Sequence, residues 1–537
     1  MKIISAYLLS KRYYVILLTL ALATSCEKDF LEDKLLSDTS VDFLYTTPEG
    51  LESAVVGLYS LNRAIYEDNR LNGTIPLILQ AKGDLGVGIT GEVSLYSRLL
   101  WGSSLGDYGT SEGLNAYWVY YYRIIDRANA IINGAENITD IDEDRRNQIL
   151  AEAKTMRANS YFILYRLFNN IFITTEPTTP ENAFDVPQDK SSEEEIFALL
   201  RSDLDFAIEH LDYNPEQFGR WGQGAARHIR AKVAMWEEDY EEAAAQADAI
   251  INSGEHSLLP STAQVFADDL NHPETLFAVN FEFQTIGGGS PHILNWNIVS
   301  SYAEAPGMVH SVENGGAGVG FLSLNQYAID LLNEDPNDSR RNTYYIFEYE
   351  YNDETALPPG KELGDPLDLY ENSETDQNEF MLYYRRQNPG VVKFLDANVE
   401  PTDRNHYKNI MVYRLAETYL IGAEAHMMLG NTAKALEYLN EVRTRANTDP
   451  VTEIDLDAIL DERARELAFE GQRWYTLKRT GKLYEYLLDH MNNDNMNESY
   501  PEGNPKVILQ EYMKNWPIPQ QQIDLLGPDY PQNEGYN

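Results

Sequence analysis

The stretch AKVAMWEEDYEEAAAQADAIINSG (residues 231–254) has the pattern of a helix, a tight turn and a second helix. A second stretch, AEAHMMLGNTAKALEYLNEVRTRA (residues 423–446), repeats this pattern, and its Gly430–Ala435 aligns with Glu238–Ala243 of the first. Small residues at the aligned positions let paired helices approach each other closely. A repeated two-helix unit predicts a scaffold of stacked helical pairs.

Helical periodicity continues outside these two units. Residues 51–66, 115–134 and 143–168 carry apolar residues at helical spacing, and the second of these ends on a glycine, which is typical of helix ends. Ser192 and Glu195 form the sequence pattern of a capping box at the start of another helix. Helices therefore account for most of the chain on both sides of its middle.

The middle of the chain, residues 283–400, has a different composition. It contains the glycine-rich loops GGGSP and GGAGVG, proline-rich turns and extended aromatic segments such as YYIFEYEYN. We therefore expect a mainly α protein with a tetratricopeptide-like helical scaffold and a large irregular insertion. Ala243 and Ala435 are expected at close contacts between helices.

The N-terminus has the features of a secretory signal. A basic front precedes the apolar run Tyr13–Ala23, which is shorter than the roughly 20 residues that span a bilayer. Cys26 is the only cysteine of the chain and cannot form an intramolecular disulfide. It follows Ala23-Thr24-Ser25 and resembles the cysteine of a bacterial lipobox, with Ala23 where the commonest pattern has Leu. We expect Cys26 to be a lipid anchor; the alternative is a buried thiol beside an ordinary cleavage site.

The composition excludes several classes of partner. The formal net charge is −43 and no contiguous basic patch stands out, so nucleic acid is a poor partner and anionic membrane surfaces repel the chain. Membrane association must then come from the lipid. A hydrophobic content of 43%, with 36 Tyr and 7 Trp, excludes a disordered chain.

Two motifs resemble functional sites, one for a dinucleotide and one for a metal ion, but a structural explanation fits each of them better. Gly86–Gly91 matches GxGxxG, with Asp107 downstream, but dinucleotide binding needs a βαβ unit, so we expect a flexible loop. Glu462, Glu466 and Glu470 are spaced like helical metal ligands, but no accompanying histidine pair exists. Arginines on the same predicted helix (Arg463, Arg465 and Arg473) favour structural ion pairs.

The sequence lacks two motifs that mark classes of enzyme. It has no P-loop and no Cys-His arrangement. A glycosidase needs only two carboxylates at a suitable separation, which sequence alone does not exclude. We expect a protein that is not an enzyme and that needs no cofactor or metal.

Most of the mature chain resembles the RagB/SusD family of outer-membrane nutrient-binding lipoproteins. Eight segments carry the resemblance in the family's order: YTTPEGLESAVVGLY (45–59), YWVYYYRIIDRANAII (117–132), RANSYFILYRLFNNIFI (157–173), GRWGQGAARHIRAKVAMWEEDYEEAA (219–244), NHPETLFAVNFE (271–282), VYRLAETYLIGAEAHMMLG (412–430), ERARELAFEGQRWYTLKRTG (462–481) and WPIPQQQIDLLGPDYPQNEGYN (516–537). One departure is Trp221 after Arg220, where Ala or Thr is more usual.

The resemblance implies a fold and a role. It implies four tetratricopeptide-like helix pairs packed against an irregular region that carries the ligand site. It also implies a lid on a TonB-dependent outer-membrane transporter (SusC-like), which captures a glycan, or in some relatives a peptide, at the cell surface. Glu27-Lys28-Asp29 resembles the acidic signal for surface export. A surface glycan hydrolase and a purely structural lipoprotein are the other classes, and the ligand stays open because relatives differ in their loops.

The expected organisation follows from these patterns: a signal peptide (1–25), a lipidated tether (26–44), a first scaffold part (45–282), the ligand-binding insertion (283–405), and a second scaffold part with the C-terminal segment (406–537).

The ligand residues are chosen by elimination among the tryptophans. Trp118, Trp236 and Trp474 fall in amphipathic helices, and Trp221 and Trp516 belong to scaffold segments of the family. Trp101 and Trp296 remain as platforms on which a sugar can stack. The neighbouring residues that could contribute are Tyr108, Tyr302, Asp84 and Asn297. The alternative is that either tryptophan fills the junction between loop and scaffold.

Overall fold

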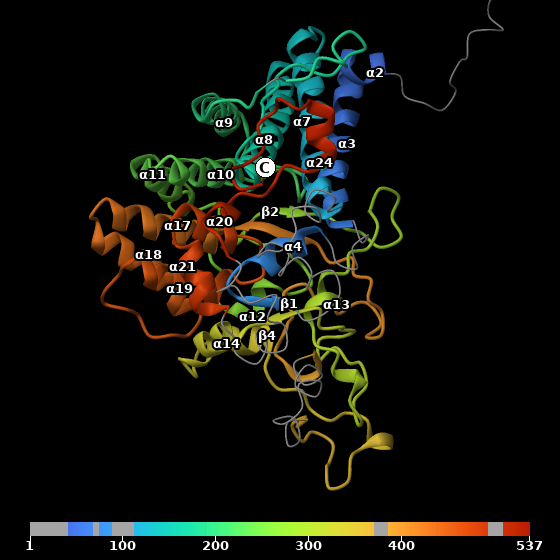
Figure 1. Cartoon of the computed structure of the whole chain (residues 1–537), viewed down its shortest axis with the longest axis vertical. Helices are drawn as coiled ribbons and strands as arrows, with labels where there is room; N and C mark the ends of the chain where they lie inside the picture. The colour runs from blue at the N-terminus through green and yellow to red at the C-terminus, as the bar shows by residue number, and fades with distance from the viewer. Residues whose placement is uncertain are drawn as a thin grey trace, which may run out of the picture.

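The computed structural model describes residues 41–67, 75–88, 112–187, 189–369, 385–491 and 509–536. Long helices form an array at the top and left of Figure 1, and loop-rich segments between residues 252 and 409 lie mainly below and to the right of it. None of the described helices is both long enough and apolar enough to cross a membrane.

The array consists of four successive helix pairs, and each pair contacts the next. The pairs are α3 (Pro48–Glu67) with α7 (Glu112–Asn137), α8 (Glu143–Phe168) with α9 (Glu193–His210), α10 (Gln223–Trp236) with α11 (Tyr240–Ile251), and α17 (Leu415–Met428) with α18 (Thr432–Arg445). The last pair packs on α11 although a long loop-rich segment separates them in sequence. The predicted helical scaffold is confirmed.

Small side chains set the close spacing of the last two pairs. Ala243 is fully buried in a cluster with alanines of α10, α11 and α17, and Ala435 is fully buried on α18. A Cβ atom added to Gly422 of α17 would lie 2.8 Å from a ring carbon of Tyr438 on α18. The expectation of close helix contacts at Ala243 and Ala435 is confirmed.

The helix ends agree with the sequence patterns except at one glycine. The Ser192 side chain accepts from the Glu195 N–H and the Glu195 side chain accepts from the Ser192 N–H, so the capping box is confirmed. Gly134 does not end its helix, because α7 continues to Asn137. A Cβ atom at Gly134 would lie 2.6 Å from the Tyr45 carbonyl oxygen, so this glycine allows the segment that includes α2 (Val41–Thr46) to approach α7.

The described strands form three two-stranded antiparallel sheets. They are β1 (Gly86–Gly88) with β3 (Leu322–Leu324), β2 (Thr275–Val279) with β6 (Ile410–Arg414), and β4 (Tyr345–Ile346) with β5 (Gly390–Val391). The expected flexible loop at Gly86–Gly91 is therefore wrong in its first half, because Gly86–Gly88 is a strand that pairs with the insertion. A Cβ atom at Gly86 would meet Leu322 at 3.2 Å, so glycine lets this strand lie close.

Short elements complete the structure. They are α4 (Ile75–Lys82), α12 (Thr262–Val265), α13 (Leu294–Ile298), α14 (Gln326–Asn333), α15 (Arg340–Thr343), α19 (Leu456–Leu467), α20 (Arg473–Arg479), α21 (Leu483–His490), α24 (Gln520–Leu526) and the 3₁₀ turns η2 (Tyr302–Glu304), η3 (Glu354–Ala356) and η6 (Glu511–Lys514). One large apolar core extends from α3 to the C-terminal segment. It includes Trp118, Trp221, Trp474 and Trp516, as expected, while Trp236 is partly exposed at its edge.

A buried ion network joins the loop-rich region to the array. Glu466 accepts from Arg340 Nη1 at 3.0 Å, from Arg414 Nη1 at 2.6 Å and from Arg445. Arg340 also donates to Glu462 at 2.6 Å, and Glu470 binds Arg414 Nε at 2.7 Å. The prediction of structural ion pairs is confirmed, and no group of residues that could hold a metal ion is found in the described ranges.

The source of the counter-charge differs from the expectation. Helix α19 ends at Leu467, so Glu470 and Arg473 do not share it with Glu462. Of the expected arginines, Arg465 does pair with Glu462 on the same helix, at 3.5 Å. Arg463 instead binds Glu417 at 3.0 Å and Arg473 binds Asp84, and the other network arginines come from α15, β6 and α18. The sequence pattern could not show this, because tertiary packing brings the partners together.

Candidate functional site

Trp296 is the partly exposed residue of a short, otherwise buried helix. The other four residues of α13 (Leu294, Asn295, Asn297 and Ile298) are all buried. Because its neighbours along the helix are held in the interior, the Trp296 ring is fixed at the protein surface.

Two side chains from distant segments contact the Trp296 ring. Phe321 meets it edge to face, with 5.4 Å between the ring centroids and 67° between the planes. The Cζ atom of Arg404 lies 5.3 Å from the Trp296 ring centroid, within the range of a cation–π contact. Phe321 is partly exposed and Arg404 is exposed. We call these three residues the Trp296 platform.

Backbone hydrogen bonds hold the Trp296 platform in place. The Val319 N–H donates to the Trp296 carbonyl at 2.8 Å, and the Phe321 N–H donates to the Asn297 carbonyl at 2.9 Å. The Arg385 Nε donates to the Val319 carbonyl at 3.0 Å. A surface that is ordered before a ligand arrives loses less entropy on binding. The platform is therefore preorganised.

The strand β1 ends beside this platform. Gly88, its last residue, pairs with Leu322, the residue after Phe321. Trp101 and Tyr108 follow Gly88 in sequence but lie outside the described residues, as does Cys26. The ligand roles expected for Trp101 and Tyr108 therefore stay predictions.

Asp84 has a structural partner in place of a ligand. It is fully buried, and Arg473 donates to both carboxylate oxygens at 2.7 Å, while His490 Nδ1 lies 2.8 Å from one of them. Burial raises the pKa of Asp84, but Arg473 and His490 outweigh it and lower the pKa to about 2. The expectation that Asp84 binds sugar hydroxyls does not fit this burial.

Asn297 and Tyr302 also point into the protein. Both are fully buried; Asn297 Nδ2 donates to the Ile293 carbonyl at 2.8 Å, and the Tyr302 hydroxyl donates to the Gly316 carbonyl at 2.8 Å. Tyr302 stacks on Tyr349 at 5.0 Å. These two residues support the loops around the Trp296 platform and do not form part of its surface.

Two residues of the platform, Phe321 and Arg404, were not predicted from the sequence. Phe321 directly follows the GGAGVG loop, and an aromatic residue after a glycine-rich loop was an available signal. Arg404 carries no such signal, since its contact with Trp296 spans more than a hundred residues of sequence.

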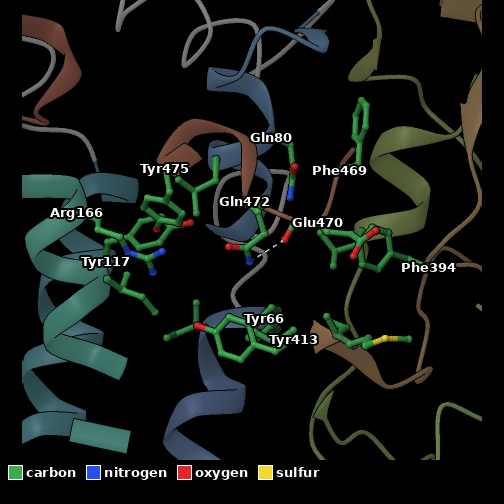
Figure 2. Close-up of a pocket in the computed structure, with 18 of the residues that line it drawn as sticks. Tyr66, Gln80, Tyr117, Arg166, Phe394, Tyr413, Phe469, Glu470, Gln472 and Tyr475 are labelled. Carbon is green, nitrogen blue, oxygen red and sulfur yellow. Dashed lines mark hydrogen bonds between the residues drawn. The ribbon is translucent and has the colours of Figure 1, made fainter. Parts of the chain in front are cut away.

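A separate, partly enclosed cavity is shown in Figure 2. Tyrosines, Arg166, Gln472 and Glu470 line it, and its volume is about 80 Å³. Ligand sites for small molecules have volumes of roughly 300–1,000 Å³. This cavity is therefore too small for a sugar.

Two family models match the chain on either side of residues 235–286. A model described as "Starch-binding associating with outer membrane" matches residues 29–234, and a model described as "SusD family" matches residues 287–536. The chain belongs to the SusD/RagB family. Neither description of the matching SusD/RagB models names an enzyme.

Relatives of this SusD/RagB-family chain match over nearly its whole length. The SusD-like protein P25 of Formosa agariphila is 28% identical over 531 residues, which cover 93% of this chain and 94% of that protein. A SusD-like protein of Bacteroides ovatus is 27% identical over 514 residues, covering 90% of this chain and 84% of that protein.

Solved structures share the fold. A laminarin-binding SusD-like protein has a TM-score of 0.68 at 23% identity, and the match covers 92% of this chain and 100% of that one. A SusD superfamily protein from Parabacteroides distasonis has a TM-score of 0.73 at 19% identity, covering 91% and 100% of the two chains. These likenesses confirm the mainly α, tetratricopeptide-like fold of the SusD/RagB family.

Proposed function

We propose that this protein is a cell-surface lipoprotein that binds a nutrient glycan and passes it to a partner TonB-dependent outer-membrane transporter. The observation that carries the proposal is the Trp296 platform, a preorganised aromatic surface in a SusD/RagB-family chain. Laminarin binding is stated for one structural neighbour, and another is a surface glycan-binding protein from Bacteroides fluxus.

The chemistry of the platform suits a sugar. A pyranose ring has an apolar C–H face, which packs on a flat aromatic ring, and a rim of hydroxyls, which need polar partners. Trp296 provides the ring and Arg404 provides N–H donors at its face. No catalytic group is required for capture and delivery.

Calorimetry with a panel of glycans tests the binding. The mature protein should bind one class of oligosaccharide, and Trp296→Ala should weaken that binding while the protein stays folded. Phe184→Ala is the matched control, since Phe184 is 91% exposed in the loop after α8 and is expected to leave binding unchanged. Binding by Trp296→Ala equal to that of the parent would remove the platform from the site.

Chromatography of the glycan after incubation separates a binder from a hydrolase. An unchanged glycan supports the proposal, and product formation would favour a surface hydrolase.

Co-purification from outer membranes tests the partner: a tagged chain should bring down a TonB-dependent transporter. Retained transporter association without saccharide or peptide binding would favour a structural lipoprotein.

The anchor is proposed at Cys26, in keeping with a family description that names association with the outer membrane. Cys26→Ala should release the protein from membranes into the periplasm or the medium. Alanine at Glu27, Lys28 and Asp29 should keep the lipid but remove exposure to added protease. A Cys26→Ala protein that stays membrane-bound and surface-exposed contradicts the anchor.

A further inference from the structure

Arg166 is a buried cation without an anionic partner. It lies near the end of α8 with 1% of its surface exposed, and its Nε donates to the Phe162 carbonyl at 3.1 Å. Within the described ranges no carboxylate forms an ion pair with it, and its Nη1 has no hydrogen-bond partner. Arg157 on the same helix is the contrast, because it binds both oxygens of Asp203 at 2.8 Å.

Arg166 carries a guanidinium group, and arginine is a permanent cation in proteins. Its guanidinium lies 4.0 Å from the Phe162 ring centroid and 3.8 Å from the Tyr475 ring centroid. Stacking of this kind satisfies the faces of the guanidinium plane. The Nη1 group at its edge still needs an acceptor, and a buried polar group without one is unfavourable.

A second buried cation adds to the positive potential. Lys478 of α20 donates to the backbone carbonyl of Arg166, and it forms no ion pair with any described carboxylate. Burial, together with the nearby charges of Lys514 and Arg166, lowers the pKa of Lys478 to about 7. Neither Arg166 nor Lys478 is therefore paired directly with a described carboxylate.

Arg166 lines the partly enclosed cavity together with hydrogen-bond donors. Figure 2 shows Arg166 and Tyr475 beside each other on one side of it, with Phe394 and Phe469 on the opposite side. Burial raises the pKa of Tyr475 to about 12, and it also raises the pKa of Tyr66 and Tyr121. These lining tyrosines keep their hydroxyl protons at neutral pH and can donate them.

Two acceptors of the lining, Glu470 and Gln472, are already bound. Glu470 receives hydrogen bonds from Arg414 and from Lys393 Nζ at 2.6 Å, and Gln472 Oε1 accepts from Lys232 Nζ at 2.6 Å. The cavity thus offers donors and positive charge to whatever occupies it.

The size limits the occupant. One water needs at least about 10–15 Å³ of such space, so about 80 Å³ holds a few waters, or one halide-sized ion with water. Sugars and nucleotides are too large.

We propose that this cavity is a binding site for a small inorganic monovalent anion, chloride in ordinary media, held by the Arg166 guanidinium and the tyrosine hydroxyls. The lining includes residues of α3, α4, α7, α8, α13, β6 and α20, so the ion would join the first helix pairs to the C-terminal part of the chain. The site is distinct from the Trp296 platform, and its existence does not depend on the proposed function.

Anomalous diffraction from bromide-soaked crystals of the mature chain is the direct test. A bromide peak within hydrogen-bond distance of Arg166 Nη1 is expected. Water alone in the cavity, with bromide only at surface positions, would overturn the proposal.

A solution experiment tests the same site with variants. Replacing gluconate by chloride at constant ionic strength should raise the midpoint of thermal unfolding by about 1–2 °C and then saturate. Tyr475→Phe keeps the stacked ring but removes a donor, and it should shift saturation to higher chloride; Arg166→Gln should abolish the response. Tyr161→Phe is the control, because Tyr161 bonds to the Thr174 carbonyl outside the cavity lining and should keep the full response.

If Arg166→Gln does not fold, Tyr475→Phe still decides the question. A chloride response in Tyr475→Phe identical to that of the parent shows a nonspecific salt effect and contradicts the site.

Discussion

The helical array and the loop-rich region satisfy their backbone hydrogen-bonding groups in different ways. In the array, helices satisfy their own backbone groups, and the interior between α10, α11 and α17 is mainly alanine. In the loop-rich region, side chains satisfy the backbone: Asn295 donates to the Gly315 carbonyl at 2.9 Å and Ser300 to the Asn388 carbonyl at 2.9 Å. Polar residues in such loops can therefore belong to the interior of the protein as well as to a binding surface.

The small core of the loop-rich region shows the same difference. It contains Tyr302, Tyr349 and Tyr351 beside aliphatic residues, so ring stacking and hydroxyl bonds replace the close helix contacts of the array. The buried ion pairs of Glu466 connect the two regions.

We expect the largest loss of stability from removing the Glu466 carboxylate, which connects the two regions. Burial raises the pKa of Glu466, but Arg445, Arg414 and Arg340 lower it well below its usual range, so the carboxylate is ionised. Glu466→Gln leaves buried guanidinium groups under-compensated, and we expect it to lower the free energy of unfolding by about 3–5 kcal/mol. Urea denaturation measures the change.

The control for this change is an exposed pair in the loop-rich region. Glu304 is 43% exposed and binds Arg385 at 3.2 Å, so Glu304→Gln should cost no more than about 1 kcal/mol. Equal effects of the two substitutions would show that the network does not hold the regions together.

Overpacking the array should have the next largest effect. Ala243→Phe inserts a ring between α10, α11 and α17 and is expected to cost about 1–3 kcal/mol. Ala435→Phe on α18 should behave alike. Ala245→Phe on the same helix as Ala243 is the control, since Ala245 is exposed. Thermal midpoints unchanged by Ala243→Phe would contradict the close packing.

Acid should destabilise the loop-rich region through a buried histidine. His292 is fully buried, and burial lowers its pKa to about 3. Between pH 6.5 and about 3 the unfolded chain takes up a proton at His292 that the folded chain does not, so stability falls as the pH falls. From pH 7 to pH 5 this contributes a loss of about 1–2 kcal/mol.

Chemical denaturation at the two pH values measures this loss. His292→Gln, which removes the titrating ring, should show a shallower dependence on pH than the parent. The same slope in both proteins would mean that His292 has no part in the acid sensitivity.

The smallest expected effect lies on the Trp296 platform itself. An exposed cation–π contact is worth about 0.5–1 kcal/mol, so Arg404→Ala and Trp296→Ala should show a coupling energy of that size in a double-mutant cycle. Unfolding in urea provides the four free energies. Additive effects of the two substitutions would mean that Arg404 does not rest on the ring in solution.

The sequence predicted the helices well and the site only in part. Helical periodicity and caps are local, so α3, α8 and the Ser192 capping box could be foreseen from neighbouring residues. The helix end at Gly134 was wrong because the glycine serves a contact with Tyr45 from another segment.

The site residues depended on distant partners. Asp84 was expected to bind sugar hydroxyls, but in the structure its partner is Arg473. Asn297 and Tyr302 lie within a few residues of Trp296, but only Trp296 is partly exposed, because the loop backbone needed the other two side chains. Proximity in sequence to an aromatic residue does not predict which side chains face a ligand.

The pairing of Asp84 with Arg473 has a consequence for how the chain folds. The two residues are 389 positions apart, so a chain delivered N-terminus first holds Asp84 long before its partner arrives. Contacts within the helix pairs are local and form quickly, whereas contacts of such separation form slowly. Refolding should therefore have a fast phase in which the helix pairs appear and a slow phase in which the ends of the chain meet around Asp84.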